Sequence, residues 1–162
     1  MATLSPEVMR ELSEHLSTKP DVMTVGTGSG LLVVATPTTL AMRREGQWLK
    51  WGWEQVASGM WREETSSFKW TTTDGGVHEA QLEEVGRLPE VFRERVQAST
   101  LLTESHDLNR GRIQIIARRS LDGSNKTSWY AVAGGGARLS DPDTAALVVE
   151  RTDALKAEYD LS

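Results

Sequence analysis

Residues 31–61, LLVVATPTTLAMRREGQWLKWGWEQVASGMW, decide the fold class of this 162-residue chain. Short apolar runs rich in Val, Thr and Trp alternate here with turn residues, among them Pro37 and the pair Glu45-Gly46. Runs of this length separated by tight turns are typical of antiparallel strands that follow one another in a meander. Strands that alternated with helices would need longer connections, so the segment argues against a parallel sheet.

The same texture continues on both sides of this segment. On the N-terminal side, residues 22–25 form an apolar run before the glycine-rich stretch 26–30. On the C-terminal side, Asp74-Gly75 is a strong two-residue turn signal between two further runs. We therefore expect seven short strands within residues 21–82.

Three segments have the spacing of helices instead. A capping Ser5 followed by Pro6 and Glu7 starts a helix over 5–17. A second helix is predicted over 88–105, because its apolar residues recur on one face; these are Leu88, Val91, Phe92, Val96, Ser99 and Leu102. A third begins at Asp141-Pro142-Asp143, and its inner face should carry Leu147, Val148, Arg151, Leu155 and Tyr159.

A hairpin is predicted between the last two helices. Residues 112–119 alternate as a strand, residues 127–133 are its partner, and Asp122-Gly123-Ser124-Asn125 forms the turn. The alternation gives the first strand two faces. The apolar face should lie in the core and carries Ile113, Ile115 and Ala117.

Seven antiparallel strands capped by one amphipathic helix is the plan of the pleckstrin-homology (PH) superfold, and the local sequence resembles bacterial PH and GRAM domains. The apolar strand 31–35 ends at Thr36 and turns into a short strand that opens on Leu40, as in those domains. The stretch 51–56, WGWEQV, is similar to their strand of the form aromatic, x, x, acidic, x, aliphatic. The resemblance implies a barrel over 21–82 and a capping helix over 88–105.

Four motifs resemble an uncharacterised family of small actinobacterial proteins. That family has an Ala-Thr turn, a Trp-Glu-x-Val strand, a helix reading Arg-Glu-Arg-Val-x-Ala-Ser and a strand reading Ile-Ala-Arg-Arg. In this chain the corresponding residues are Ala35-Thr36, 53–56, 93–99 and 116–119. The resemblance covers roughly residues 21–133 and brings no known activity with it.

Composition and charge narrow the function class. The chain is 38% hydrophobic and 25% charged, which is ordinary for a water-soluble domain. No run approaches about 18 apolar residues, so we expect no transmembrane helix. Pro6 and Glu7 stand where a signal peptide needs an apolar core, which predicts a cytoplasmic location. The net charge of −5 disfavours a dedicated nucleic-acid binder.

We find no set of residues that could carry catalysis. Residues 26–30, GTGSG, lack the G-x-G-x-x-G spacing and precede a strand, which predicts a hairpin turn rather than a phosphate loop. There is no cysteine, and His15, His78 and His106 lack metal-ligand spacing. The sequence also has no G-x-S-x-G motif. We therefore expect no catalytic residues, no metal and no cofactor.

Two groups of residues are candidates for binding. Five of the six tryptophans lie within 48–70; core packing is one interpretation, and exposure in a groove is the other, with Trp51 and Trp53 as candidates. The second group is the basic hairpin 110–126. Its exposed side chains either form a solvated face or bind an anion, an acidic peptide or a nucleic acid; the candidates are Arg110, Arg112, Arg118 and Lys126.

The sequence thus predicts an α+β fold: a PH-like, seven-strand antiparallel, partly open barrel capped by a helix, with a C-terminal β-hairpin plus helix extension. Residues 1–107 should hold the first helix, the barrel and the capping helix, and residues 108–162 should pack on the same unit. The leading function is a non-enzymatic cytoplasmic binding or adaptor module whose partner is another protein. The alternatives are a small-ligand-binding protein or enzyme that uses a Trp-lined face, and a nucleic-acid-associated protein that uses the basic hairpin.

Overall fold

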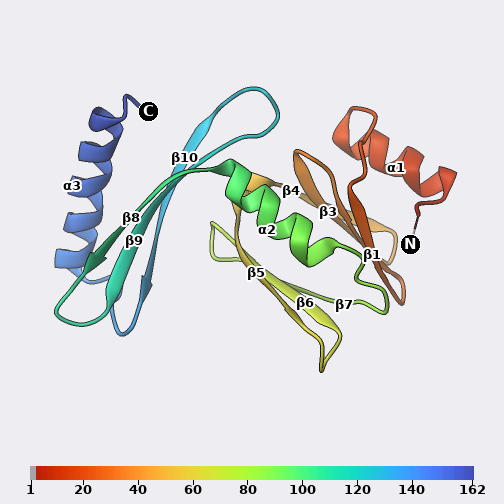
Figure 1. The fold of residues 1–162 in the computed structure, drawn as a ribbon, viewed down its shortest axis with the longest axis horizontal. Coiled ribbons are helices and arrows are strands. Elements are labelled where there is room, and N and C mark those ends of the chain that lie inside the picture. The colour runs from red at the N-terminus through yellow and green to blue at the C-terminus, as the bar shows by residue number, and fades with distance from the viewer. Residues whose placement is uncertain (1–2) are drawn as a thin grey trace. The chain divides into compact units, whose positions relative to one another are not determined.

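The computed structural model describes residues 3–162, which form three α-helices and ten strands in three antiparallel sheets (Figure 1). The fold class is therefore α+β, as predicted. The chain divides into two units, one that ends at Ala98 and one that runs from Ser99 to Ser162. Within residues 3–162, none of the helices has the length and hydropathy of a membrane-spanning segment.

Seven strands of the first unit form two sheets, and this number agrees with the prediction. The four-stranded sheet consists, in order, of β1 (Thr24–Gly28), β2 (Leu31–Ala35), β3 (Thr39–Arg44) and β4 (Gln47–Gly52). The three-stranded sheet consists, in order, of β5 (Val56–Arg62), β6 (Ser67–Thr72) and β7 (Val77–Gln81). The strands of the described residues do not close into a barrel, so the predicted barrel is not confirmed.

The connection between the two sheets corrects one prediction. Residues 51–56 were expected to form a strand, but Trp53–Gln55 is a short 3-10 helix, η1. The Trp53 ring is fully buried and its Nε1 donates a hydrogen bond to the Thr36 carbonyl oxygen at 2.8 Å. The Gly52 N–H donates to Gln55 Oε1 at 2.8 Å. These two hydrogen bonds stabilise the turn that connects β4 to β5.

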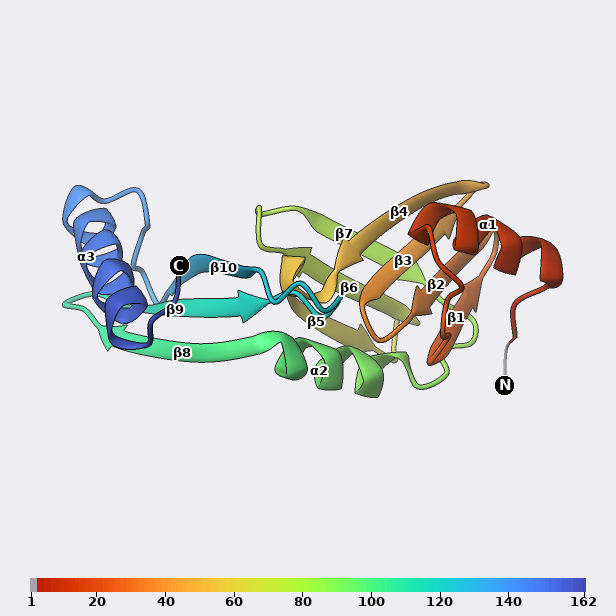
Figure 2. The ribbon, with the colours of Figure 1, turned by 90° about the horizontal axis from the view of Figure 1, so that it is seen from above.

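The helix α2 (Leu88–Ser99) follows β7 and lies beside β5 and β6 (Figures 1 and 2). Its Phe92 ring packs edge-on against Phe68 and Trp53, with centroid distances of 5.1 and 5.7 Å. The predicted helix over 88–105 is wrong beyond Ser99. From Thr100 the chain forms a strand: residues 100–107 alternate in exposure and pair with a later strand, with a register shift between Thr100 and Leu102.

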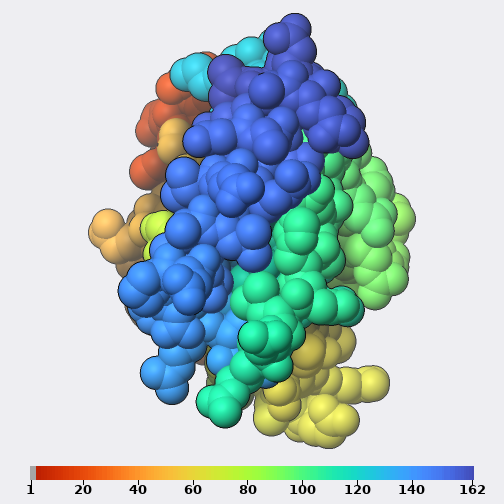
Figure 3. Space-filling view, turned by 90° about the vertical axis from the view of Figure 1, so that its left-hand side faces the viewer, coloured from red at the N-terminus to blue at the C-terminus, as the bar shows by residue number. Residues whose placement is uncertain are grey.

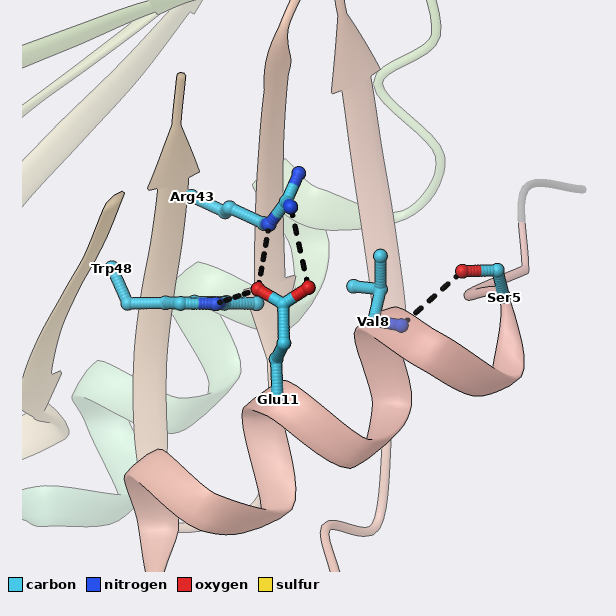
Figure 4. Close-up of polar contacts among 5 residues, drawn as sticks. All are labelled: Ser5, Val8, Glu11, Arg43 and Trp48. Carbon is cyan, nitrogen blue, oxygen red and sulfur yellow. Dashed lines mark hydrogen bonds and ion pairs between the residues drawn. The ribbon is translucent and has the colours of Figure 1, made fainter. Parts of the chain in front are cut away.

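The helix α1 (Pro6–Leu16) is capped as the sequence predicts, since the Val8 N–H donates to Ser5 Oγ at 3.2 Å (Figure 4). Its buried Leu12 packs against Val34 and Ala41 of the four-stranded sheet. The Glu11 carboxylate also faces this sheet. It accepts hydrogen bonds from Trp48 Nε1 at 3.0 Å and from Arg43 at 3.1 and 3.3 Å (Figure 4).

These contacts make the stability of the first unit depend on pH. The Trp48 hydrogen bond and the Arg43 guanidinium lower the pKa of Glu11 below its ordinary value of 4.5. Because the folded pKa is the lower one, Glu11 contributes stability above pH 4.5, and this contribution is lost as pH falls through the folded pKa. In urea titrations, the difference in midpoint between the parent and Glu11→Gln should be positive at neutral pH and should shrink in acid. A difference that does not change with pH would contradict this role.

The second unit is a three-stranded sheet with one helix against it. In order, its strands are β10 (Thr127–Gly134), β9 (Arg112–Arg119) and β8 (Thr100–Asp107). The helix α3 (Pro142–Glu158) lies across one face of this sheet (Figure 2). The predicted core residues Ile113, Ile115 and Ala117 are all buried, which confirms the alternation.

One ion pair and one buried side chain fasten α3 to the sheet. Arg151 binds the Glu104 carboxylate through two nitrogens, at 2.9 and 3.2 Å, and Leu155 is buried. Tyr159, predicted on the inner face, is 56% exposed, because the helix ends one residue before it. The strand β8 belongs to the unit that begins at Ser99, although we expected residues up to 107 to belong to the first part. The packing of residues 108–162 on the preceding part stays a prediction.

Candidate functional site

The basic side chains of the predicted hairpin do not form one site. Arg118 was expected to be exposed, which is wrong: it is 1% exposed. Its Nε donates to Ser99 Oγ at 2.8 Å and its Nη1 to the Tyr130 hydroxyl at 3.1 Å. Hydrogen bonds to a guanidinium are strong enough to offset much of its loss of water, which is why this arginine is buried.

The other three basic candidates are exposed but separated. Arg112 forms a surface ion pair with Asp107 at 3.0 Å. Arg110 lies in the turn before β9, and Lys126 lies in the turn after it. An eight-residue strand stands between these two turns, so Arg110 and Lys126 are at opposite ends of the hairpin.

The two tryptophan candidates do not line a groove together. Trp53 is fully buried, so the packing interpretation is right for this ring. Trp51 is half-buried and lies against His78 and Trp70, with centroid distances of 4.5 and 5.6 Å. A Trp-lined face of the kind that the sequence suggested is not formed by this pair.

A groove does lie elsewhere in the first unit, between β5 and α2. Its volume is about 460 Å³. The helix side contributes Pro89, Arg93, Val96 and Gln97, and the strand side contributes Ser58, Gly59, Met60 and Trp61. Phe68 and Phe92 also line the groove, and both rings are buried.

Gly59 shapes the groove because it has no side chain. A Cβ at this position would lie 2.6 Å from two atoms of the Phe92 ring. Any other residue would therefore push the ring away from the strand. With glycine here, the Phe92 ring packs directly under β5.

The strand β5 presents an open edge beside this groove. In its sheet β5 pairs with β6 alone. Within the described residues, positions 57–62 make no backbone–backbone hydrogen bond outside that pairing. Residues 58–60 are exposed, and Met60 is 57% exposed. An exposed edge is a template on which a further strand can pair.

The rim of the groove carries one positive charge. Arg93 is exposed on α2 and forms no ion pair with any residue in the described part of the chain. The site therefore combines aromatic and aliphatic walls, unpaired main-chain groups and a cation. No cluster of three or more His, Asp or Glu side chains that could hold a metal ion lies within residues 3–162.

This groove was not predicted from the sequence, and the tryptophan that lines it is not one of the two candidates. Trp61 lines the groove, whereas Trp51 and Trp53 do not. One signal was present: Gly59 interrupts the apolar strand 56–61, and glycine inside a strand often marks a close approach of another group. The sequence could not identify that group as the ring of Phe92.

Comparisons with known proteins give no family for this chain. No protein-family model, no curated protein and no solved structure matches it.

Proposed function

We propose that this protein is a non-enzymatic cytoplasmic binding module that takes up an extended segment of another protein along β5. The observation that carries the proposal is the unpaired edge of β5 directly beside the apolar groove. An added strand gains main-chain hydrogen bonds from such an edge, and every second side chain of that strand enters the groove.

We also propose that the first unit has a PH-like fold. Seven strands in sheets of four and three, followed by α2, support a PH-like first unit. An isolated bridge between Thr27 and Glu84 adds support, because it joins β1 to the segment after β7. PH-like domains serve mostly as interaction scaffolds, which agrees with a binding role. The similarity to the small actinobacterial family is also kept as a proposal.

The groove sets the chemistry of the partner segment. Side chains that point the same way along a strand are separated by about 6.6 Å. Two apolar side chains at this spacing would reach the ring of Phe92 and the side chain of Trp61. An acidic residue near them would face Arg93, and complementary charges favour one register over others. We therefore expect the pattern apolar, x, apolar with an acid beside it.

The two other functions suggested by the sequence gain less support. The basic hairpin holds its charges at opposite ends and has one of its arginines buried. Trp53 is fully buried, and the half-buried Trp51 lies against His78 and Trp70.

The proposal is tested by selecting peptides from a random display library with the purified full chain. We expect binders that share the predicted pattern. Arg93→Glu should weaken them about three- to tenfold, because it replaces one attractive surface charge by a repulsive one. Lys69→Glu is the matched control: it makes the same charge change at an exposed residue outside the groove, and it should alter affinity less than twofold. A library that yields no binder, or binders that ignore Arg93→Glu, would contradict the proposal.

A further inference from the structure

A second cavity, of about 790 Å³, lies entirely within the second unit. It is lined by the turn 108–110 between β8 and β9, by residues 136–138 after β10, and by the first turn of α3. Figure 3 faces this unit; the teal turn and the blue segment before α3 lie side by side at its lower end.

Two glycines allow the two segments that form the walls of this cavity to approach each other closely. Gly111 has φ +82°, and a Cβ there would lie 2.2 Å from the Gly134 carbonyl oxygen. Gly136 has φ +98°, and a Cβ there would lie 2.7 Å from Arg110 Cγ. The turn and the segment after β10 therefore pack backbone against backbone, and the stem of Arg110 lies on Gly136. This packing holds the aliphatic part of the Arg110 side chain against the wall of the cavity.

Four charged residues line the cavity without pairing. They are Arg110, Arg138, Asp141 and Asp143. None of them forms an ion pair with another residue in the described part of the chain. Two cations and two anions, all of them exposed, thus line one pocket.

The start of α3 adds donors to this pocket. Asp141 is the N-cap residue, but its carboxylate makes no capping hydrogen bond, so the first N–H groups of this 17-residue helix are not satisfied by it. Thr144 lines the pocket and is 8% exposed. Among residues 3–162 its hydroxyl has no hydrogen-bond partner. The hydroxyl oxygen is not enclosed by protein, so it can donate a hydrogen bond to a ligand oxygen that enters the pocket.

We propose that this pocket binds a small zwitterion, a molecule that carries a carboxylate beside an ammonium group, as a free amino acid does. The carboxylate meets Arg110, Arg138, the Thr144 hydroxyl and the positive end of α3. The ammonium group meets Asp141 and Asp143. A zwitterion matches both signs of charge, whereas a phosphate dianion would also face two carboxylates. This proposal does not depend on the groove of the first unit.

The test is a titration of the ¹⁵N-labelled full chain, followed by its amide NMR shifts. The probes are the standard L-amino acids, each alone, with acetate, methylammonium and inorganic phosphate as single-charge comparisons. At least one amino acid should shift the amides of Asp143 and Thr144 and saturate at or below about 1 mM. Acetate, methylammonium and phosphate should not saturate in that range. If no amino acid saturates, or if acetate or phosphate binds equally well, the proposal is wrong.

Variants of residues that line the pocket assign the binding to it. The double variant Arg110→Gln/Arg138→Gln should weaken binding at least tenfold, and Thr144→Val should weaken it about two- to tenfold. Asp141→Asn/Asp143→Asn should remove the preference for the amino acid over acetate. Arg119→Gln, an exposed arginine at the other end of β9, is the control and should change nothing. Thermal midpoints establish that each variant is folded. Binding that survives the double arginine variant would overturn the proposal.

Discussion

Phe92→Ala should lower the free energy of unfolding by about 3–5 kcal/mol, the usual cost of deleting a buried phenylalanine ring. The ring is 4% exposed and packs edge-on against Phe68 and Trp53. Its removal would leave a cavity between α2 and β5, because Gly59 has no side chain to fill the space. The chemical denaturation midpoint of the full chain measures the effect.

The matched control is Arg93→Ala, an exposed change at the next position of the same helix. Surface changes of this kind usually alter stability by less than about 0.5 kcal/mol. If the two variants unfolded at the same denaturant concentration as the parent, α2 would not cover the sheet as described.

Ile115→Ala should cost about 2–5 kcal/mol in the second unit. Ile115 is 1% exposed and lies on the face of the sheet that α3 covers, directly opposite Glu104 in the strand pairing. Its loss leaves a cavity under the helix. Ile116→Ala is the matched control. It is the same substitution one residue later, on the opposite face of the sheet, where the side chain is half-buried, so it should cost less stability. Equal losses from the two variants would contradict the placement of α3.

Much of the backbone could be predicted because its signals are local. The cap of α1 needs only Ser5 and Pro6, and the burial of Ile113 and Ile115 needs only the period of a strand. The end of α2 was missed for a physical reason. Val96, Ser99 and Leu102 fit the spacing of a helix, while residues 100–107 also fit that of a strand, and pairing with β9 decided between the two.

The sites could not be predicted because their parts come from distant positions. The buried Arg118 donates hydrogen bonds to the hydroxyl groups of Ser99 and Tyr130, which lie 19 and 12 residues away in the sequence. The groove depends on the close approach of Phe92 in α2 to Gly59 in β5. Two further strands, β6 and β7, separate these elements in the sequence. Charge, hydropathy and strand alternation along the chain do not reveal these long-range contacts, and the candidate binding residues were chosen from those local patterns.

Amide hydrogen exchange of the full chain measures whether β5 receives an added strand. The measurement compares the free chain with the chain saturated by a peptide selected from the display library. Because residues 57–62 have main-chain groups without backbone partners outside the β5–β6 pairing, their exchange should slow when the peptide pairs with them. The control strand is β7, on the far side of the sheet, whose exchange should not change. We expect slowed exchange at 57–62. Unchanged exchange there, with protection appearing elsewhere in the chain, would show that the peptide does not pair with β5.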